Sequence, residues 1–305
     1  MFDLVAPKTA NRAPALEEHP ADPFVERVVL ATDGGPGGTS AMKWIAHRAR
    51  NHRVDVDVSI VVEADRLTAQ VRGGDSDEAA DSVVSGAKRY LERVAPSAQV
   101  RGSVSWGDAR ERFARASQAA DLLVVGGGGG GRLAGLLGGS FPVKLAESSE
   151  CPTIVVPRSW TSGHGAVVVG VDADLEDQPA LRFAVHEARV LHRRLRVVHC
   201  WQVPFVRTLA GVSPSSLAEA AARQTRALAG ILERLRAEDT DLDIRGVVAE
   251  AHPADALSRE AAGQEILVVG AHRRTAEERL FLGSTSREIL ARPPCPVAVV
   301  RARAI

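Results

Sequence analysis

The most constraining feature of this 305-residue sequence is that its second half repeats its first. The segment ATDGGPGGTSAMKWIAHRA, which begins at Ala31, parallels GVDADLEDQPALRFAVHEA, which begins at Gly170. Asp172 therefore aligns with Asp33 at an offset of 139 residues (172 − 33). Because this period is as long as a domain, it predicts a duplicated domain rather than a solenoid of short repeats.

The match returns near the end of each half. GGSFPVKLAESSECPTIVVPR, from Gly138, parallels LGSTSREILARPPCPVAVVRA, from Leu282, with an offset of 144 residues (282 − 138). We therefore predict two domains of the same fold, joined by a short linker and preceded by a polar, Pro- and Ala-rich tail that we expect to be disordered. The predicted boundaries are 1–23 for the tail, 24–158 for domain 1, 159–164 for the linker and 165–305 for domain 2.

Each half alternates short apolar runs with helical patterns. In the first half we predict strands at 27–32, 55–62, 100–106, 122–125 and 152–156, and helices at 40–50, 80–94, 108–119 and 141–148. Runs such as VVL, LLVV and IVV are typical of parallel strands covered on both faces. Regular strand–helix alternation favours right-handed βαβ units. The predicted fold is therefore α/β, with two tandem doubly wound, Rossmann-like parallel sheets of five strands each.

The charge balance narrows the range of partners. Lysine plus arginine equals aspartate plus glutamate, 38 against 38, so there is no global electrostatic case for binding nucleic acid or a membrane surface. Three cysteines are too few for a disulfide framework and suit a reducing compartment. No apolar run is long enough to cross a bilayer, and the first residues lack the pattern of a secretory signal. The expected location is the cytoplasm.

A glycine-rich segment follows the predicted strand 122–125. GGGGGGRLAGLLGGS runs from Gly126 to Ser140 and places Gly126, Gly129 and Gly139 at the spacing glycine, two residues, glycine, nine residues, glycine, then serine. Glycine allows backbone N–H groups to turn inward at φ values that other residues avoid. Such groups next to a helix N-terminus bind phosphates.

Asp33 follows the first predicted strand. In a doubly wound sheet, ligands lie beyond the carboxyl ends of the strands, where the strand order reverses. If the strands at 27–32 and 122–125 are neighbours at that reversal, Asp33 and the glycine loop face one crevice. The carboxylate would then accept hydrogen bonds from a sugar or a base while the loop holds phosphates.

Competing interpretations remain for these residues. The glycine run could be a flexible loop without a ligand, and Asp33 and Asp172 could be turn or helix-capping residues. A dinucleotide fingerprint is excluded by context, since no acidic residue follows the next strand, and no Walker lysine is present. Cys151 and Cys295 occupy equivalent positions before an apolar run, which indicates packing. We predict no metal site and no catalytic residue.

The loop resembles the signature of the ATP-binding branch of the universal stress protein family. Asp33 and Asp172 resemble the first-strand aspartate of that family, and SECPTIVV and PPCPVAVV resemble its cysteine-proline entry to the final strand. The resemblance covers nearly the whole chain after Pro23, twice. It implies a strand order of 3-2-1-4-5 in each half, ATP in the crevice, Mg²⁺ as a candidate ion on the phosphates, and roles in stress survival and growth control.

The same resemblance implies a set of nucleotide-binding residues in each half. The backbone near Val61, and near its counterpart Cys200, would contact adenine. The full implied set is Asp33, Val61, Gly126, Gly129, Gly139, Ser140 and Phe141 in the first half, and Asp172, Cys200, Gly270, Gly283, Ser284, Thr285 and Ser286 in the second.

Both halves depart from the family pattern. Arg273 stands where the second half should carry the second glycine. It could add positive charge to a phosphate site, together with Arg274 and His272, or it could fill the pocket. In the first half, Pro142 stands where the second half has Ser286, which removes one donor near the phosphates.

The leading functional prediction is a nucleotide-binding regulatory protein with at most weak ATP hydrolysis, because the loop is complete but no nucleophile or general base accompanies it. One alternative is an interaction module of the non-nucleotide branch, and another is an ATP-using enzyme of the adenine-nucleotide α-hydrolase group. The resemblance also implies that the two halves pair through their final strands as an intramolecular pseudo-dimer. A homodimer and a regulatory protein partner remain open.

Overall fold

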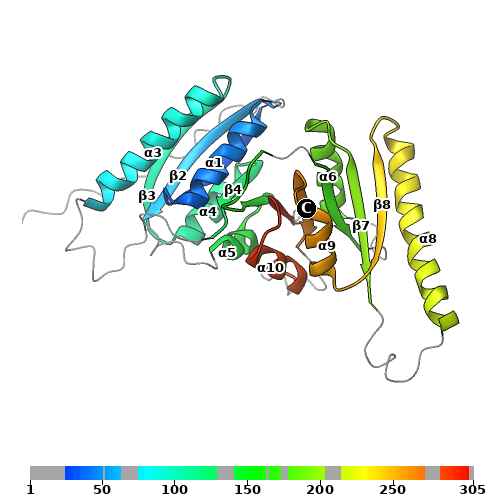
Figure 1. The fold of residues 1–305 in the computed structure, drawn as a ribbon. Helices are drawn as coiled ribbons and strands as arrows, with labels where there is room; N and C mark the ends of the chain where they lie inside the picture. The colour runs from blue at the N-terminus through cyan, green and yellow to red at the C-terminus, as the bar shows by residue number, and fades with distance from the viewer. Residues whose placement is uncertain are drawn as a thin grey trace, which may run out of the picture.

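The computed structural model describes residues 25–50, 52–62, 75–128, 141–162, 165–172, 178–202, 214–271 and 282–301. In these ranges, ten strands form one continuous sheet with helices on both faces (Figure 1). The strands are β1 (Glu26–Ala31), β2 (Val54–Val62), β3 (Gln99–Trp106), β4 (Leu122–Gly126), β5 (Thr153–Val156), β6 (Val167–Val171), β7 (Leu195–Trp201), β8 (Ile244–Glu250), β9 (Ile266–Gly270) and β10 (Val297–Val300). The helices are α1 (Pro36–Arg48), α3 (Asp75–Val94), α4 (Ala109–Gln118), α5 (Phe141–Ser148), α6 (Pro179–Val190), α8 (Pro214–Glu238), α9 (Pro253–Ala261) and α10 (Ser284–Ala291).

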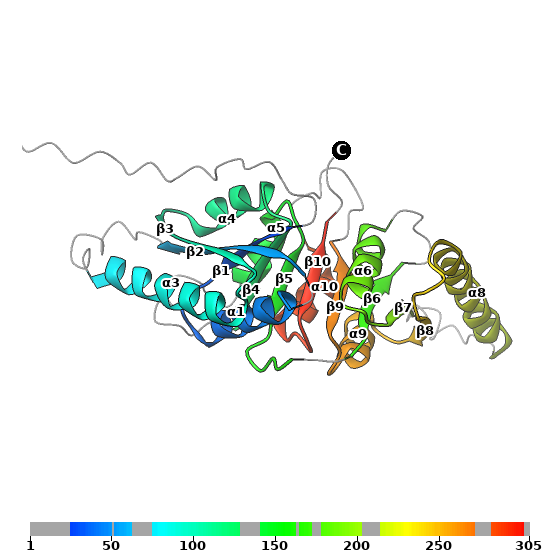
Figure 2. The same cartoon turned by 90° about the horizontal axis from the view of Figure 1, so that it is seen from above.

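The strand order is β3-β2-β1-β4-β5-β10-β9-β6-β7-β8. Numbered from its own first strand, each half therefore has the order 3-2-1-4-5, and every pair within a half is parallel. The predicted fold class and strand order are confirmed. Figure 2 shows the sheet running from β3 at one end of the molecule to β8 at the other.

The two halves join through β5 and β10, which pair antiparallel. Ile154 lies opposite Ala298 at the centre of this pairing. An unpaired strand edge is a ready site for association, and here each half covers the edge of the other. The sheet is thereby continuous across the boundary between the halves.

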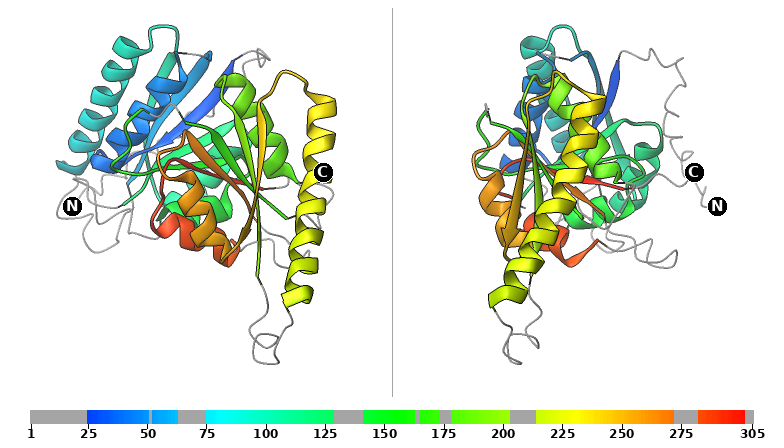
Figure 3. Two further views of the ribbon diagram at one scale, coloured as in Figure 1. Left: turned by 45° about the vertical axis from the view of Figure 1, so that its right-hand side comes forward. Right: turned by 90° about the vertical axis from the view of Figure 1, so that its right-hand side faces the viewer.

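Two main apolar cores lie between the sheet and its helices, one on each face, and a small third cluster joins β2 to α3. Because side chains alternate along a strand, Val28 and Leu30 face one core while Val29 and Ala31 face the other. Helices α1, α3, α6 and α8 cover the first face, and α4, α5, α9 and α10 cover the second. Helix α8 lies at the outer end of the second half (Figure 3). Among the helices that the structure describes, none combines the length and apolarity needed to span a membrane.

Two helices begin earlier than the sequence predicted, since α3 starts at Asp75 rather than at Ala80. Helix α1 starts at Pro36 rather than at Ser40, so Gly37 and Gly38 belong to its first turn. Proline suits the first helical position because its missing N–H would have no helical partner there. The consequence is that the N-terminus of α1 reaches the tips of β1 and β4.

Candidate functional site

Asp33 lies just beyond β1, at the carboxyl edge of the sheet in the first half. β1 pairs with β2 on one side and with β4 on the other, so the strand order reverses at this point. Asp33 is 8% exposed and lines a small hollow together with Gly126, Gly128 and Phe141. The structure therefore brings the carboxylate and the start of the glycine loop into the same hollow, as the sequence predicted.

The Asp33 carboxylate also has a local role. Its Oδ1 accepts a hydrogen bond from the backbone N–H of Gly35 at 2.8 Å. Gly34, between them, has a φ of 73°, in the left-handed region that favours glycine. The turn interpretation of Asp33 is thus correct for one of its two oxygens, and it does not exclude a role of the side chain in the hollow.

The backbone around the hollow is tightly packed. A Cβ on Gly37 would lie 2.9 Å from the carbonyl oxygen of Gly127, so α1 approaches β4 through residues that lack side chains. Gly128 has a φ of 77°. The space left between these segments is about 20 Å³, enough for roughly one water. Only a group about the size of a hydroxyl would enter it.

Packing in the hydrophobic core fixes the positions of Val61 and Phe141. Val61 lies two positions beyond Ser59, the residue of β2 that pairs with the end of β1, and its side chain is 4% exposed. Only its backbone can therefore face a ligand. Phe141 begins α5 and packs edge-on against Phe113, with 6.1 Å between ring centroids. Gly129, Gly139 and Ser140 lie outside the described residues.

The second half arranges the equivalent residues differently. The backbone of Asp172 is held by Gln178, whose Oε1 accepts from the Asp172 N–H at 3.1 Å and whose Nε2 donates to the Asp172 carbonyl at 2.9 Å. Ser286 is buried, and its hydroxyl donates to the carbonyl of Gly270 at 3.1 Å. The Ser286 hydroxyl is therefore engaged within the fold, whereas the Gln178 contact uses the backbone of Asp172 and not its carboxylate.

The remaining predicted residues of the second half lie at the same carboxyl edge. Gly283 is the N-cap of α10, with no side-chain cap, and Ser284 and Thr285 form the first turn of this helix. Cys200 is half-buried near the end of β7, and burial raises the pKa of its thiol to about 11. His199 uses both ring nitrogens, toward the Val171 carbonyl and the Gln224 amide oxygen, as expected for a structural histidine. Arg273 lies outside the described residues.

Comparison with known proteins decides the family. The model of the universal stress protein family matches residues 25–157 and again residues 164–301. The chain belongs to the universal stress protein family. It carries two copies of the family domain, which explains both the internal repeat and the duplicated strand order.

Relatives in the universal stress protein family match over nearly their whole length. Universal stress protein Rv2005c of Mycobacterium tuberculosis is 28% identical over 288 residues, covering 90% of this chain and 96% of that protein. Universal stress protein Rv1996 of the same species is 27% identical over 301 residues, covering 90% and 94%. The crystal structure of a universal stress protein from Archaeoglobus fulgidus has the same fold, with a TM-score of 0.66 at 17% identity, covering 91% of this chain and 97% of that chain.

One basic residue beside the universal stress protein loop was not predicted from the sequence. Arg158 follows β5 and is exposed, and its side chain lies next to Gly128, where an added Cβ would be 2.9 Å from the Arg158 Cδ. The Ser40 hydroxyl anchors the same residue by donating to the Arg158 carbonyl at 2.9 Å. Its position two residues after the last strand, at the same sheet edge as the loop, was the available signal.

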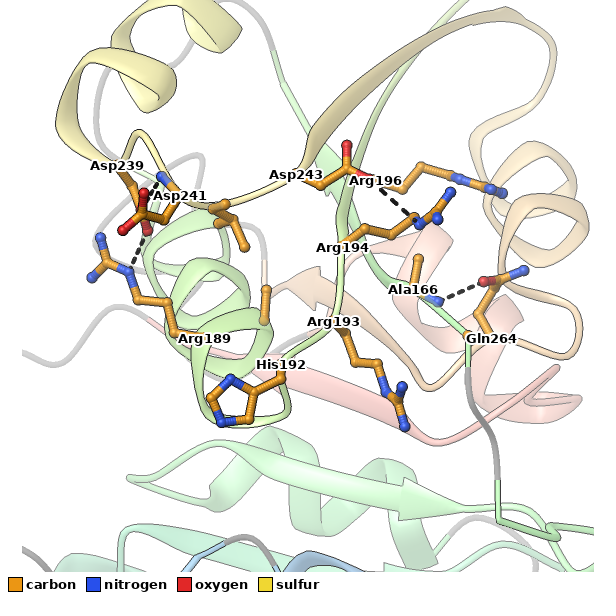
Figure 4. A pocket seen from close by; sticks show the side chains of 13 residues that line it. Ala166, Arg189, His192, Arg193, Arg194, Arg196, Asp239, Asp241, Asp243 and Gln264 are labelled. Atoms are coloured by element: carbon orange, nitrogen blue, oxygen red, sulfur yellow. Dashed lines mark hydrogen bonds and ion pairs between the residues drawn. The ribbon is translucent and has the colours of Figure 1, made fainter.

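A larger pocket, of about 830 Å³, opens at the opposite, amino-terminal edge of the second half (Figure 4). Its arginines are neutralised by nearby acids. Arg189 binds Asp239 at 2.6 Å, and this hydrogen bond lowers the pKa of the Asp239 carboxyl. The other arginines of the pocket also lie within 4 Å of a carboxylate: Arg193 beside Glu265, Arg194 beside Asp243 and Arg196 beside Glu260. This balance gives no electrostatic argument for an anion there.

One group of possible metal ligands was not predicted. His252, Asp255 and Glu288 place ligand atoms within 4.8 Å of one another at the meeting of α9 and α10. The imidazole and the Glu288 carboxylate are 42% and 54% exposed, and exposed acidic groups commonly lie this close without an ion. At the equivalent positions the first half carries Asp108, Glu111 and Lys144, so the group is not a shared feature of the two domains.

Proposed function

We propose that this universal stress protein binds ATP at the first-half crevice and acts in stress response and growth regulation through nucleotide-dependent conformation or partner binding. The observation that supports this proposal is the position of Asp33 and the start of the glycine loop at one hollow. They meet where the strand order reverses, which is the usual ligand position in doubly wound sheets. The sequence of the loop from Gly126 to Ser140 supplies the phosphate-binding amides.

The chemistry of the described residues suits parts of ATP. Backbone amides and the helix N-terminus of α1 carry partial positive charge, which favours phosphate. No acidic side chain occupies the first turn of α1, but the Asp33 carboxylate lies at the same hollow, so it would face a sugar or base donor rather than the phosphates. Arg158, beside Gly128, would add a full positive charge. The hollow itself admits one small group, so the rest of the nucleotide would lie over the strand ends.

The second half is the weaker nucleotide site under this proposal. Ser286 and the Asp172 backbone are engaged by Gly270 and Gln178, and the sequence places Arg273 where a glycine is needed. A backbone requirement is not met by adding charge. We therefore expect tighter binding in the first half than in the second. Bound ATP could carry Mg²⁺ on its phosphates, with at most weak hydrolysis.

Calorimetry with ATP and with GTP, each with and without Mg²⁺, tests the proposal. ATP should release or absorb measurable heat and raise the thermal midpoint, while GTP should do so less because the adenine contact is lost. A folded chain that shows neither effect at millimolar ATP would instead be an interaction module. Phosphate release clearly above that of an Asp33→Asn variant would identify an ATP-using enzyme.

A further inference from the structure

A buried ion pair lies at the boundary between the two halves. Arg48 of α1 and Glu187 of α6 are each only 1% exposed. Arg48 donates from Nη1 to Glu187 Oε2 at 2.7 Å and from Nη2 to Oε1 at 2.8 Å, which is a two-pronged contact. Glu26 closes the other side of the guanidinium, with 2.6 Å between Arg48 Nε and Glu26 Oε2.

These two partners occupy the same position in the two repeats. Glu187 follows Arg48 by 139 residues, the offset that aligns the first helices of the two halves. In β5 and β10, Ile154 likewise lies opposite Ala298, its own counterpart at the offset of 144 residues (298 − 154). Residues that meet their own counterparts lie close to a two-fold axis. The halves therefore pair about a local two-fold axis. This axis passes close to the Arg48–Glu187 pair and to the Ile154–Ala298 pair.

On such an axis, pairing of identical halves would place like charges together. Two copies of the second half would set Glu187 against Glu187, and the position equivalent to Glu26 is Gly165, so no neighbouring charge is available there. Two copies of the first half would set Arg48 against Arg48, with each Glu26 left as the only partner. Buried like charges are strongly disfavoured, and such contacts exclude wrong partners.

The opposite face of the sheet has a similar asymmetry. Arg287 of α10 binds Glu147 of α5 across the boundary at 2.7 Å, and Arg301 donates to the Glu147 carbonyl. The counterparts of Arg287 and Glu147 in the repeat are Val143 and Ala291. A pairing of identical halves would lose this ion pair as well.

We propose that Arg48 and Glu187 select the partner of each half, so that the β5 edge accepts the β10 edge of a second half and rejects the equivalent edge of a second copy of its own kind. Duplication of a self-pairing domain leaves two edges that could each pair with their own kind in other chains. Opposite charges at one equivalent position remove that ambiguity, because only unlike halves are complementary there. The interaction surface is thus specific for the unlike half.

Two full-length variants test this selection. Arg48→Glu sets a carboxylate against Glu187, and Glu187→Arg sets a guanidinium against Arg48, so each variant alone carries like charges at its internal boundary. In a mixed dimer, every half can meet a half of opposite charge. We expect each variant alone to have a lower thermal midpoint than the wild-type chain. We expect the equimolar mixture to form a 1:1 dimer by light scattering, with a midpoint above that of either variant.

A mixture that behaves as the sum of its components would overturn the proposal, and so would variants that unfold at the wild-type temperature. If a variant does not fold alone, the two are co-expressed with different tags. Recovery of a soluble 1:1 complex on sequential purification then supports the selection, and its absence contradicts it. The matched control is Arg27→Glu with Asp121→Arg, an exposed pair within the first half, which must form no mixed dimer.

Discussion

Gly126 and Gly37 meet backbone to backbone at the tip of the first half. A Cβ added to Gly126 would lie 2.1 Å from the carbonyl carbon of Gly37. At Gly270, the counterpart of Gly126, the nearest atom of the described residues to such a Cβ is the Ala180 side chain at 3.8 Å. The first half therefore brings its first helix and fourth strand together through two glycines, while Glu176, the counterpart of Gly37, lies outside the described residues.

Alanine substitution should reveal this difference. Gly126→Ala forces β4 away from α1, and overpacking of this kind costs about 1–3 kcal/mol of unfolding free energy. Among the described residues, Gly270→Ala meets only an ordinary van der Waals contact, and it should change stability by less than about 0.5 kcal/mol. Denaturant unfolding of both variants measures the two costs. Equal losses at the two sites would show that the close approach in the first half is not a constraint.

Replacing Asp33 separates its turn role from a ligand role. Asp33→Asn keeps an oxygen that can accept from the Gly35 N–H, so the turn and the thermal midpoint should be preserved. The loss of a charged acceptor for ATP should weaken binding by about 1–3 kcal/mol. Titration calorimetry of this variant measures its affinity for ATP, and thermal unfolding measures its midpoint. Unchanged affinity for ATP would show that Asp33 stabilises the turn and does not contact the nucleotide.

The buried ion pair makes a prediction about stability as well as partner choice. Burial opposes the charged form of Arg48, but attraction by Glu187 and Glu26 outweighs it and raises the pKa of the guanidinium. Arg48→Met leaves Glu187 buried without its cation and should cost about 3–5 kcal/mol of unfolding free energy. The double variant Arg48→Met with Glu187→Met should recover much of that loss.

The control for this comparison of single and double variants is the surface pair of Arg115 and Glu111, whose side chains are 69% and 64% exposed. Arg115→Ala should cost less than about 1 kcal/mol, as is usual for surface pairs. Denaturant unfolding is the measurement in each case. A double variant as unstable as Arg48→Met would mean that the charges themselves, rather than the unpaired carboxylate, determine the cost.

The thiols of Cys295 and Cys200 predict a loss of stability at high pH. Burial raises the pKa of Cys295 to about 12 and that of Cys200 to about 11, from an ordinary value of 9.0. The folded state therefore holds these protons when the unfolded state has released them. The stabilisation is complete below pH 9.0 and is lost as the pH rises through the raised values.

Alkylation by iodoacetamide at pH 8 should accordingly be slow in the folded chain and fast in denaturant. Cys200→Ala should reduce the fall in stability above pH 9, and Cys295→Ala should reduce it more. Rapid alkylation of Cys295 in the folded chain would show that its thiol is not shielded by the core.

Much of the fold was predictable because it depends on local patterns. Continuous apolar runs such as Leu122–Val125 are typical of strands covered on both sides, and the duplicated segments carry this information twice. The bounds of α5, Phe141–Ser148, agree with the prediction. The start of α1 was missed because Gly37 and Gly38 have low helix propensity, whereas Pro36 and the packing of β4 against the first turn favour helix there.

The placement of Asp33 opposite the loop was predictable from the rule for strand ends. The meeting of Arg48 with Glu187 was not, because it depends on which helices cross a boundary that forms only when β5 pairs with β10. The large pocket lined by Arg189 and Asp239, which lies within the second half, was missed for a different reason. Its residues lie on a helix and loops far apart in sequence, and no local pattern connects them.

The binding stoichiometry of ATP tests the central claim most directly. Titration calorimetry of the wild-type chain is compared with that of Gly129→Arg, which copies into the first half the arginine that the second half carries at Arg273. We predict that the wild-type chain binds ATP and that Gly129→Arg removes one bound ATP per chain. An unchanged stoichiometry, or no binding by the folded wild-type chain at millimolar ATP, would contradict the account.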